Sequence, residues 1–180
     1  MQASAQQASP GARRVLLIED DEGDHFLTRE YFADFERADE YQLEWEQTYS
    51  AGLDALLGQQ YDACLLDYRL GARDGIELLS EAREQGCRIP IILLTGEKSR
   101  DVDREAMRRG AADYLVKSEM SAPLLERSVR HAIERARYTA DQRFLAAASE
   151  HLTSSLDHRE ILEKIAEAAT EEFADYCAVE

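Results

Sequence analysis

The stretch that decides the fold is Ala63-Cys64-Leu65-Leu66-Asp67. Four apolar residues in a row are typical of a strand that is buried on both faces, as in the middle of a parallel sheet. An aspartate directly after such a run lies at the carboxyl end of the strand. Open α/β sheets bind their ligands at that edge, so Asp67 is the first candidate site residue.

Three further apolar runs also end in polar or charged residues. They are Val15-Leu16-Leu17-Ile18, followed by Glu19, Asp20 and Asp21; Ile91-Ile92-Leu93-Leu94, followed by Thr95; and Tyr114-Leu115-Val116, followed by Lys117. If the four strands are parallel neighbours, these polar side chains meet Asp67 at one edge of the sheet. The sequence therefore predicts a site made of aspartates, a hydroxyl and an amine.

Helical segments alternate with the strands along the chain. We expect a helix from His25 to about Phe35, capped by Asp24, and a short helix capped by Ser50. Leu43-Glu44-Trp45-Glu46 alternates and predicts a half-exposed second strand. Repeated strand–helix alternation with short connections implies right-handed crossovers and a parallel sheet covered on both faces. The predicted fold class is α/β.

Composition narrows the class of protein. Of the 180 residues, 44% are hydrophobic, which is enough for a core, and no run approaches the roughly 20 apolar residues that a membrane helix needs. The net charge of −16 argues against unaided binding to nucleic acid. The three cysteines are widely spaced, which favours packed thiols over disulfides. We therefore expect a cytoplasmic protein with a disordered leader over residues 1–12 and no membrane segment.

The predicted cluster of carboxylates suits phosphoryl chemistry. Carboxylates this close together repel each other and need a compensating cation at neutral pH. Asp20, Asp21 and Asp67 offer oxygen ligands, which suits Mg²⁺, with Asp21 as the best direct ligand and Asp20 in support. Asp67 can act as a nucleophile toward a phosphoryl group, while Lys117 and Thr95 hold the phosphoryl oxygens. Each residue taken alone has a plainer explanation as a turn, cap or solvated charge, so the prediction depends on the whole set.

This arrangement resembles the receiver domain of two-component response regulators over residues 13–135. The stretches Leu65-Leu66-Asp67-Tyr68-Arg69-Leu70, Asp74-Gly75-Ile76-Glu77-Leu78-Leu79 and Pro90-Ile91-Ile92-Leu93-Leu94-Thr95 are typical of that family. The matching residues are Asp20 and Asp21 as the acidic pocket, Asp67 as the phosphoacceptor, Thr95 as the switch hydroxyl, Lys117 as the family's lysine, and Tyr114 as the aromatic that rotates on activation. One departure is Ser118, which stands where the family usually has proline.

The resemblance implies a five-stranded doubly wound sheet of the flavodoxin-like type, with strand order 2-1-3-4-5. It implies Mg²⁺ held by Asp20, Asp21, Asp67 and the main-chain carbonyl of Arg69. It also implies transfer of a phosphoryl group from a phosphohistidine of a partner histidine kinase or phosphotransfer protein. Self-phosphorylation from small donors and slow self-dephosphorylation would follow, rather than the activity of a dedicated enzyme. Arg69 and Glu97 flank the pocket, where they either pair or are solvated independently.

The chain continues beyond the receiver-like region. The helical pattern runs on from Pro123 without glycine or proline, so we expect a linker helix over residues 136–150. The segment after it resembles the start of a GAF sensory domain, which we place at residues 151–180. Asp157 is the expected cap of a helix there, and Cys177-Ala178-Val179 is an expected opening strand. A lone strand is not a fold, so we expect a fragment of a longer protein, with a free-standing helical tail as the alternative.

Two functions follow from these expectations. The first is a phosphorylation-dependent switch. In it, Asp67, Thr95 and Tyr114 change the face formed by the fourth helix, the last strand and the last helix. The long C-terminal helix then carries the change onward or into a homodimer. The second is a pseudo-receiver, an interaction or dimerisation module whose pocket is not phosphorylated. A stand-alone aspartate-nucleophile phosphatase would need a second acid two residues beyond Asp67, where Arg69 stands.

Overall fold

Five parallel strands form the central sheet of the protein. The computed structural model describes residues 11–96 and 99–155. The sheet has the order β2-β1-β3-β6-β7. The strands are β1 (Arg13–Ile18), β2 (Tyr41–Glu46), β3 (Ala63–Asp67), β6 (Ile91–Thr95) and β7 (Asp113–Val116). Leaving aside the short strands β4 and β5, this is the order 2-1-3-4-5, so the predicted fold is confirmed.

A small hairpin between β3 and α3 was not predicted. β4 (Arg69–Leu70) and β5 (Arg73–Asp74) pair antiparallel and form a separate two-stranded sheet. Gly71 lies between them with φ +62°, a left-handed conformation that glycine adopts without steric cost. The hairpin follows Asp67 directly and therefore forms one border of the sheet edge where the candidate site lies.

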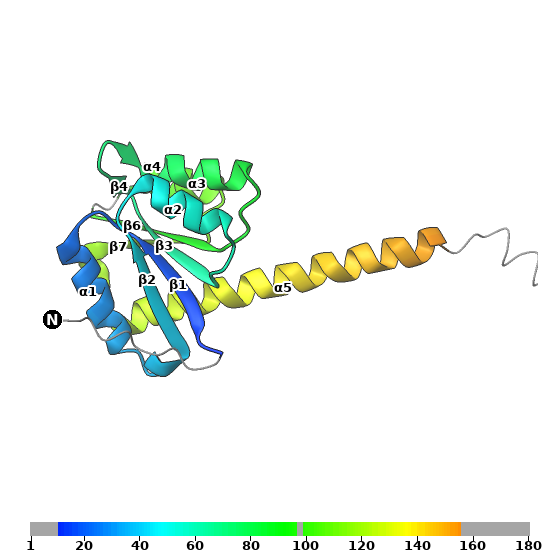
Figure 1. Ribbon diagram of the computed structural model, residues 1–180, viewed down its shortest axis with the longest axis horizontal. Helices are drawn as coiled ribbons and strands as arrows, with labels where there is room; N and C mark the ends of the chain where they lie inside the picture. The colour runs from blue at the N-terminus through cyan, green and yellow to red at the C-terminus, as the bar shows by residue number, and fades with distance from the viewer. Residues whose placement is uncertain (1–10, 97–98, 156–180) are drawn as a thin grey trace, which may run out of the picture. The chain divides into compact units, whose positions relative to one another are not determined.

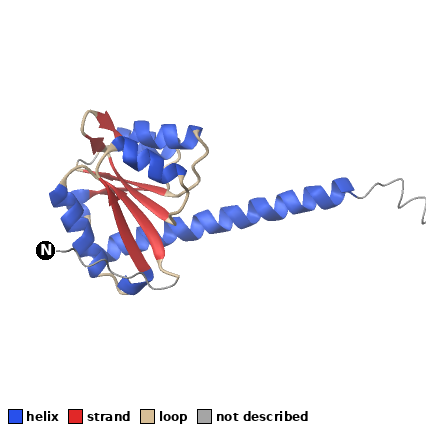
Figure 2. Ribbon diagram, in the orientation of Figure 1, coloured by secondary structure: helices blue, strands red, loops and turns tan. Residues whose placement is uncertain are grey.

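Helices cover both faces of the sheet (Figures 1 and 2). They are α1 (Glu22–Ala33), α2 (Tyr49–Leu57), α3 (Gly75–Glu84), α4 (Arg100–Arg108) and α5 (Ala122–Ser155), with two short 3-10 turns, η1 (Ala38–Glu40) and η2 (Lys117–Glu119). Alternate side chains of β1 enter two different cores. Val15 and Leu17 pack in the core that includes Val129 of α5, whereas Leu16 and Ile18 pack in the core on the other face. The central strands are thus buried on both sides, as the apolar runs predicted.

Two helices begin earlier than the sequence suggested. The prediction that Asp24 caps the first helix was wrong, because Asp21 is the N-cap and its side chain accepts a hydrogen bond from the Asp24 N–H. The cap of α2 is likewise Thr48 rather than Ser50, with the Thr48 hydroxyl accepting from the Ala51 N–H. In both cases a residue with an extended backbone precedes the helix, which is what an N-cap requires.

The chain divides into two compact units, Met1–Arg137 and Tyr138–Glu180, and the boundary between them lies within α5. The first unit holds the sheet and all the candidate site residues that the structure describes. In the second, the helix continues to Ser155 and exposes Tyr138, Phe144 and Leu145. The predicted linker over 136–150 lies within α5, and the predicted GAF-like elements at Asp157 and Cys177-Ala178-Val179 lie outside the described residues. In the described ranges, every helix is too short or too polar to cross a membrane.

Candidate functional site

The carboxyl ends of the central strands meet at a single cavity of about 670 Å³. The register explains why. Ile18 of β1 pairs with Leu66 of β3, so the residues that follow them, Glu19 and Asp67, come level at the sheet edge. Asp67 in turn pairs with Leu94 of β6, directly before Thr95. The cavity is lined by Glu19, Asp20, Asp21, Asp24, Asp67, Tyr68, Arg69, Thr95, Gly96, Ser99, Val102 and Lys117.

An acidic group forms the floor of the cavity. One carboxylate oxygen from each of Glu19, Asp20 and Asp67 lies within 4.8 Å of the others. Glu19 is 1% exposed and Asp67 is 5% exposed, whereas Asp20 faces solvent and accepts a hydrogen bond from the Gly71 N–H at 3.0 Å. Burial raises the pKa of Glu19 to about 7, although its hydrogen bond to Lys117 acts in the opposite direction. Burial also raises the pKa of Asp67, and the negative charge of Asp20 adds to this.

Lys117 supplies the positive charge at the site. Its Nζ atom lies 2.6 Å from Glu19 Oε2, from Asp67 Oδ1 and from Asp24 Oδ2. Burial alone would lower the pKa of Lys117, but hydrogen bonds to these three carboxylates raise it above its ordinary value. The lysine therefore stays protonated across the physiological range, and it joins η2 to the residue after β1, to β3 and to α1.

The Asp67 carboxylate is fixed from two directions. Oδ1 contacts Lys117, and Oδ2 accepts a hydrogen bond from the Arg69 N–H at 2.8 Å. Behind it, α3 approaches so closely that a Cβ added at Gly75 would overlap the main-chain oxygen of Asp67. The Gly75 N–H donates to the Tyr68 carbonyl at 2.7 Å, which holds this approach in place. A nucleophile held in this way can present an oxygen to a group that enters the cavity.

The predicted switch residues lie near the site in different positions. Thr95 is buried at the end of β6 and lines the cavity. Tyr114 is half-buried in β7, packs against the core shared with α2, α3 and α4, and is not part of the cavity lining. Its hydroxyl accepts a hydrogen bond at 3.5 Å from the N–H of Ser99, which is the N-cap of α4. Tyr114 thus contacts the residue at which α4 begins, and Thr95 is the last residue of β6.

The sequence did not identify every residue of the site. Glu19 is in the acidic group and Asp21 is not, because the Asp21 carboxylate caps α1. The available signal was position, since Glu19 is the first acid after the β1 run just as Asp67 is the first after the β3 run. Asp24, expected only as a cap, binds Lys117 across 93 positions of sequence. Glu97 lies outside the described residues.

Ser118 and Trp45 complete the surroundings of the site. Ser118 sits in the η2 turn that follows β7, and its peptide bonds are trans. Trp45 of β2 donates its indole N–H to the Glu19 carbonyl at 2.8 Å, and its ring stacks on His25 with centroids 3.7 Å apart. Trp45 is the chain's one tryptophan, and it is therefore one hydrogen bond from the acidic group.

The acidic group fits a divalent cation of the Mg²⁺ type. Mg²⁺ prefers carboxylate oxygens and keeps several of its waters, so it needs few protein ligands and an open side. Glu19, Asp20 and Asp67 supply oxygens from three side chains, and exposed Asp20 leaves one side open to solvent. Together with Lys117, such an ion would offset the charge of a phosphoryl group, which needs this kind of stabilisation during transfer.

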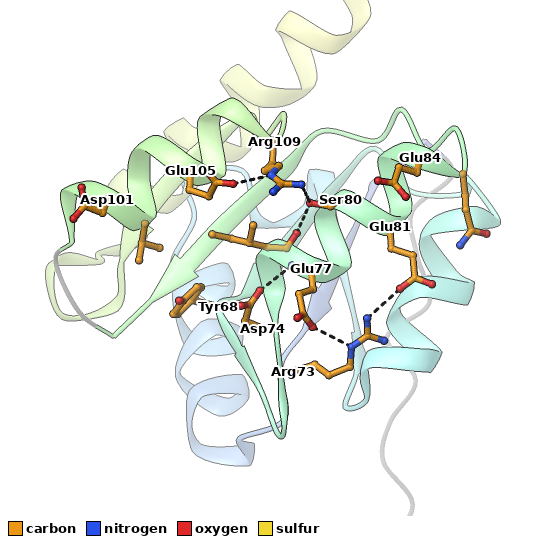
Figure 3. Close-up of a pocket in the computed structure, with 13 residues that line it drawn as sticks. Tyr68, Arg73, Asp74, Glu77, Ser80, Glu81, Glu84, Asp101, Glu105 and Arg109 are labelled. Carbon is orange, nitrogen blue, oxygen red and sulfur yellow. Dashed lines mark hydrogen bonds and ion pairs between the residues drawn. The ribbon is translucent and has the colours of Figure 1, made fainter.

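A second cavity, of about 920 Å³, lies between α3 and α4. Figure 3 shows its ion pairs: Arg73 of β5 reaches Glu77 and Glu81 of α3, and Arg109 pairs with Glu105 of α4. Tyr68 and Val102 line this cavity and also the first one. The α3–α4 cavity thus shares two side chains with the candidate site.

Comparison with known proteins agrees with this geometry. Transcriptional regulatory protein RprY of Bacteroides fragilis is 38% identical over 104 residues, which are 58% of this chain and 42% of that protein. Transcriptional regulatory protein QseB of Escherichia coli O157:H7 is 38% identical over 106 residues, 58% of this chain and 46% of that protein. The chain thus matches less than half the length of these relatives.

Solved structures show the same fold. A CheY-like response regulator receiver domain protein from Methanospirillum hungatei JF-1 has a TM-score of 0.62 at 21% identity, covering 71% of this chain and 98% of the other. A receiver domain protein from Clostridium thermocellum has a TM-score of 0.61 at 22% identity, with the same coverage of 71% and 98%. The family model for the response regulator receiver domain matches residues 15–129, from β1 into α5 and across every described residue of the cavity. The chain therefore belongs to the response regulator receiver domain family.

Proposed function

We propose that this protein is a phosphoacceptor of a two-component or phosphorelay system, with Asp67 as the residue that takes the phosphoryl group. The observation that carries the proposal is the joint placement of Asp67, the acidic group and Lys117 in one cavity at the sheet edge. The donor is a phosphohistidine of a partner histidine kinase or phosphotransfer protein. The supporting fact is membership of the receiver family, since its members interact with such partners.

Glu19, Asp20 and Asp67 are the proposed holders of Mg²⁺, with the main-chain carbonyl of Arg69 as a further oxygen. When bound, the ion offsets negative charge on the phosphoryl oxygens. Asp21 keeps its place as the cap of α1. This ligand set replaces Asp21 with Glu19 because Glu19, and not Asp21, shares the oxygen cluster with Asp67.

In the transfer step an Asp67 carboxylate oxygen attacks the phosphorus of the donor. A new oxygen–phosphorus bond forms, the bond from phosphorus to the donor nitrogen breaks, and the histidine nitrogen keeps that electron pair. The product at Asp67 is an acyl phosphate. Lys117 and the Thr95 hydroxyl donate hydrogen bonds to the phosphoryl oxygens. Water later attacks the same phosphorus and releases inorganic phosphate, which returns the Asp67 carboxylate.

The switch is proposed to pass through Thr95 and Tyr114. Movement of Thr95 toward the phosphoryl group shifts the segment before α4, where the Tyr114 hydroxyl bonds to Ser99. The face formed by α4, β7 and α5 then changes, and α5 carries the change toward its C-terminal part or into a homodimer. Arg69, which lines the cavity, is proposed to flank the phosphoryl group, and the protein is proposed to act in the cytoplasm.

The decisive experiment is intact mass spectrometry after incubation with Mg²⁺ and acetyl phosphate. We expect the wild-type chain to gain the mass of one phosphoryl group, and Asp67→Ala to gain none. Omission of Mg²⁺, with a chelator present, should abolish the gain. If the wild type stays unmodified although calorimetry shows that it binds Mg²⁺, the pocket is not a phosphoacceptor and the protein is an interaction module of the pseudo-receiver kind.

A further inference from the structure

The ammonium of Lys117 has three carboxylate partners. A lysine ammonium carries three N–H donors and no acceptor. Contacts of 2.6 Å to Glu19, Asp67 and Asp24 therefore occupy all three donors. Glu19 and Asp67 belong to the acidic group, but Asp24 does not. The third partner comes instead from a helix on one face of the sheet.

Asp24 is held firmly on the first turn of α1. It stands three residues after the N-cap Asp21, and its N–H donates to the Asp21 carboxylate at 2.9 Å. An acidic side chain at this position commonly reaches back to the N–H of the cap residue. The Asp24 carboxylate instead points across the cavity to Lys117 of η2. Because the helix holds the backbone of Asp24 in place, the carboxylate can hold the ammonium of Lys117 in a defined position.

The three contacts of Lys117 have different fates during phosphoryl transfer. When Asp67 becomes an acyl phosphate, its carboxylate loses the negative charge that attracted Lys117. The N–H that pointed to Asp67 is then the one closest to the new phosphoryl oxygens. Glu19 and Asp24 are not modified in the transfer and still hold the ammonium, from the residue after β1 and from α1. The lysine can change one partner without moving its nitrogen.

We propose that Asp24 is a positioning residue for Lys117, which directs one N–H of the ammonium toward Asp67 and the incoming phosphoryl group. The proposal rests on the proposed function of the cavity, and it assigns a role in transfer to a residue of α1. This role and simple competition predict opposite changes in the rate of phosphorylation when the charge of Asp24 is removed. If Asp24 only competed with the phosphoryl group for Lys117, removing its charge would speed phosphorylation, whereas loss of a positioning contact slows it.

The test compares Asp24→Asn with Glu22→Gln. Glu22 is an exposed acid in the same first turn of α1 and is not among the residues that line the cavity, so its variant removes the same charge without touching Lys117. Phosphorylation by acetyl phosphate is followed over time by intact mass at saturating Mg²⁺. We expect the rate constant of Asp24→Asn to fall about fivefold or more and that of Glu22→Gln to change by less than about twofold. Asp24→Glu, which keeps the charge, should recover most of the rate.

Magnesium affinity, measured by calorimetry, separates positioning from a general loss of the site. Because Asp24 is outside the acidic group, Asp24→Asn should bind Mg²⁺ as the wild type does. A wild-type or faster rate in Asp24→Asn overturns the positioning role, as does a loss of Mg²⁺ affinity that accounts for the slower rate. If the wild type itself takes no phosphoryl group, the proposed function fails and the role of Asp24 fails with it. A phosphorylated wild type with an unaffected Asp24→Asn removes the positioning role alone.

Discussion

Asp20 and Asp21 are adjacent in sequence, but the structure gives their carboxylates different surroundings. Asp20 lies in the acidic group with Glu19 and Asp67, whereas Asp21 caps α1. Asp20→Asn should therefore abolish stabilisation of the fold by Mg²⁺, and Asp21→Asn should retain it. In the wild type, Mg²⁺ at about 100 times its dissociation constant should add about 2.7 kcal/mol to the free energy of unfolding.

Thermal unfolding with and without MgCl₂ measures this difference. Asp21→Asn should start from a stability close to that of the wild type, because asparagine caps a helix about as well as aspartate. Asp21→Ala should lose about 1 kcal/mol of the free energy of unfolding, equally in both buffers, because alanine cannot cap the helix. An Asp21→Asn protein that no longer responds to Mg²⁺, next to an Asp20→Asn protein that still does, would show that Asp21 is the ligand.

Loss of the proton from Glu19 should lower the free energy of unfolding of the metal-free protein as the pH rises. Its pKa is raised from 4.5 to about 7 in the folded state, chiefly by burial. Between these two values the folded protein holds a proton that the unfolded chain has released. The stabilising contribution is therefore complete below the unfolded pKa and is lost as the pH rises through about 7. The raised pKa of Asp67 has the same sign.

Urea unfolding in a chelating buffer, from about pH 5 to about pH 8, measures the effect. We expect the free energy of unfolding to fall by an amount on the order of 1–3 kcal/mol. Glu19→Gln, which keeps the shape without the charge, should flatten much of the dependence. A wild-type stability that stays level or increases over this range would contradict the assignment.

The contrast between Glu19 and Asp24 explains what sequence could and could not predict at this scale. Asp67, Thr95 and Lys117 each follow a buried run at the next position, so the pattern places them directly. Three acids follow β1. Position favours the first of them, Glu19, as the partner of Asp67, and the β1–β3 register places these two residues level at the sheet edge. Asp24 binds a residue 93 positions away, and helix periodicity holds no information about such a contact.

At the scale of elements, Gly75 is the point where α3 meets β3. A Cβ there would overlap the Asp67 carbonyl oxygen and also press on the Leu66 side chain. Gly75→Ala should therefore lower the free energy of unfolding by about 1–3 kcal/mol, because either the helix or the strand end must move. The same movement displaces Asp67, so the rate of phosphorylation should fall as well.

Gly96→Ala is the matched control for stability. A Cβ at Gly96 would have no atom within 4 Å, so its stability should stay close to that of the wild type. Chemical denaturation of the two variants and the wild type gives the comparison. Equal stability of Gly75→Ala and Gly96→Ala would mean that α3 can shift without cost and that the close approach does not constrain Asp67.

Element boundaries show the limit of the apolar pattern. The five sheet strands were predictable because each is a run of apolar residues or an alternating stretch, and their order follows from the family resemblance. The starts of α1 and α2 were misplaced because Asp21 and Thr48 compete with nearby residues that cap equally well in isolation. Two-residue strands such as β4 and β5 are too short for any periodicity to mark.

At the scale of the whole molecule, the first compact unit contains every residue of the candidate site that the structure describes. All residues of the cavity lie before Arg137, and α5 contributes Leu125, Val129 and Ile133 to the core before that point. A chain ending at Arg137 should therefore fold, melt within a few degrees of the full chain, and accept a phosphoryl group at the same rate.

Melting curves and the acetyl phosphate assay on both chains check this expectation. Cutting instead before Leu125 should prevent folding, since the face of the sheet that α1 and α5 cover would lose part of its core. A slower rate in the chain ending at Arg137, at equal stability, would assign a part in the reaction to residues 138–180.

Tyr68 and Val102 line both the α3–α4 cavity and the cavity of Asp67, which makes the α3–α4 cavity a candidate binding site for inhibitors. A small molecule bound between α3 and α4 would touch Tyr68 and Val102, which also line the cavity that holds Asp67. Inhibitors of phosphoryl sites usually have to imitate a highly charged group and enter cells poorly as a result. In this protein, a compound bound in the α3–α4 cavity would contact two side chains of the Asp67 cavity without imitating a phosphoryl group.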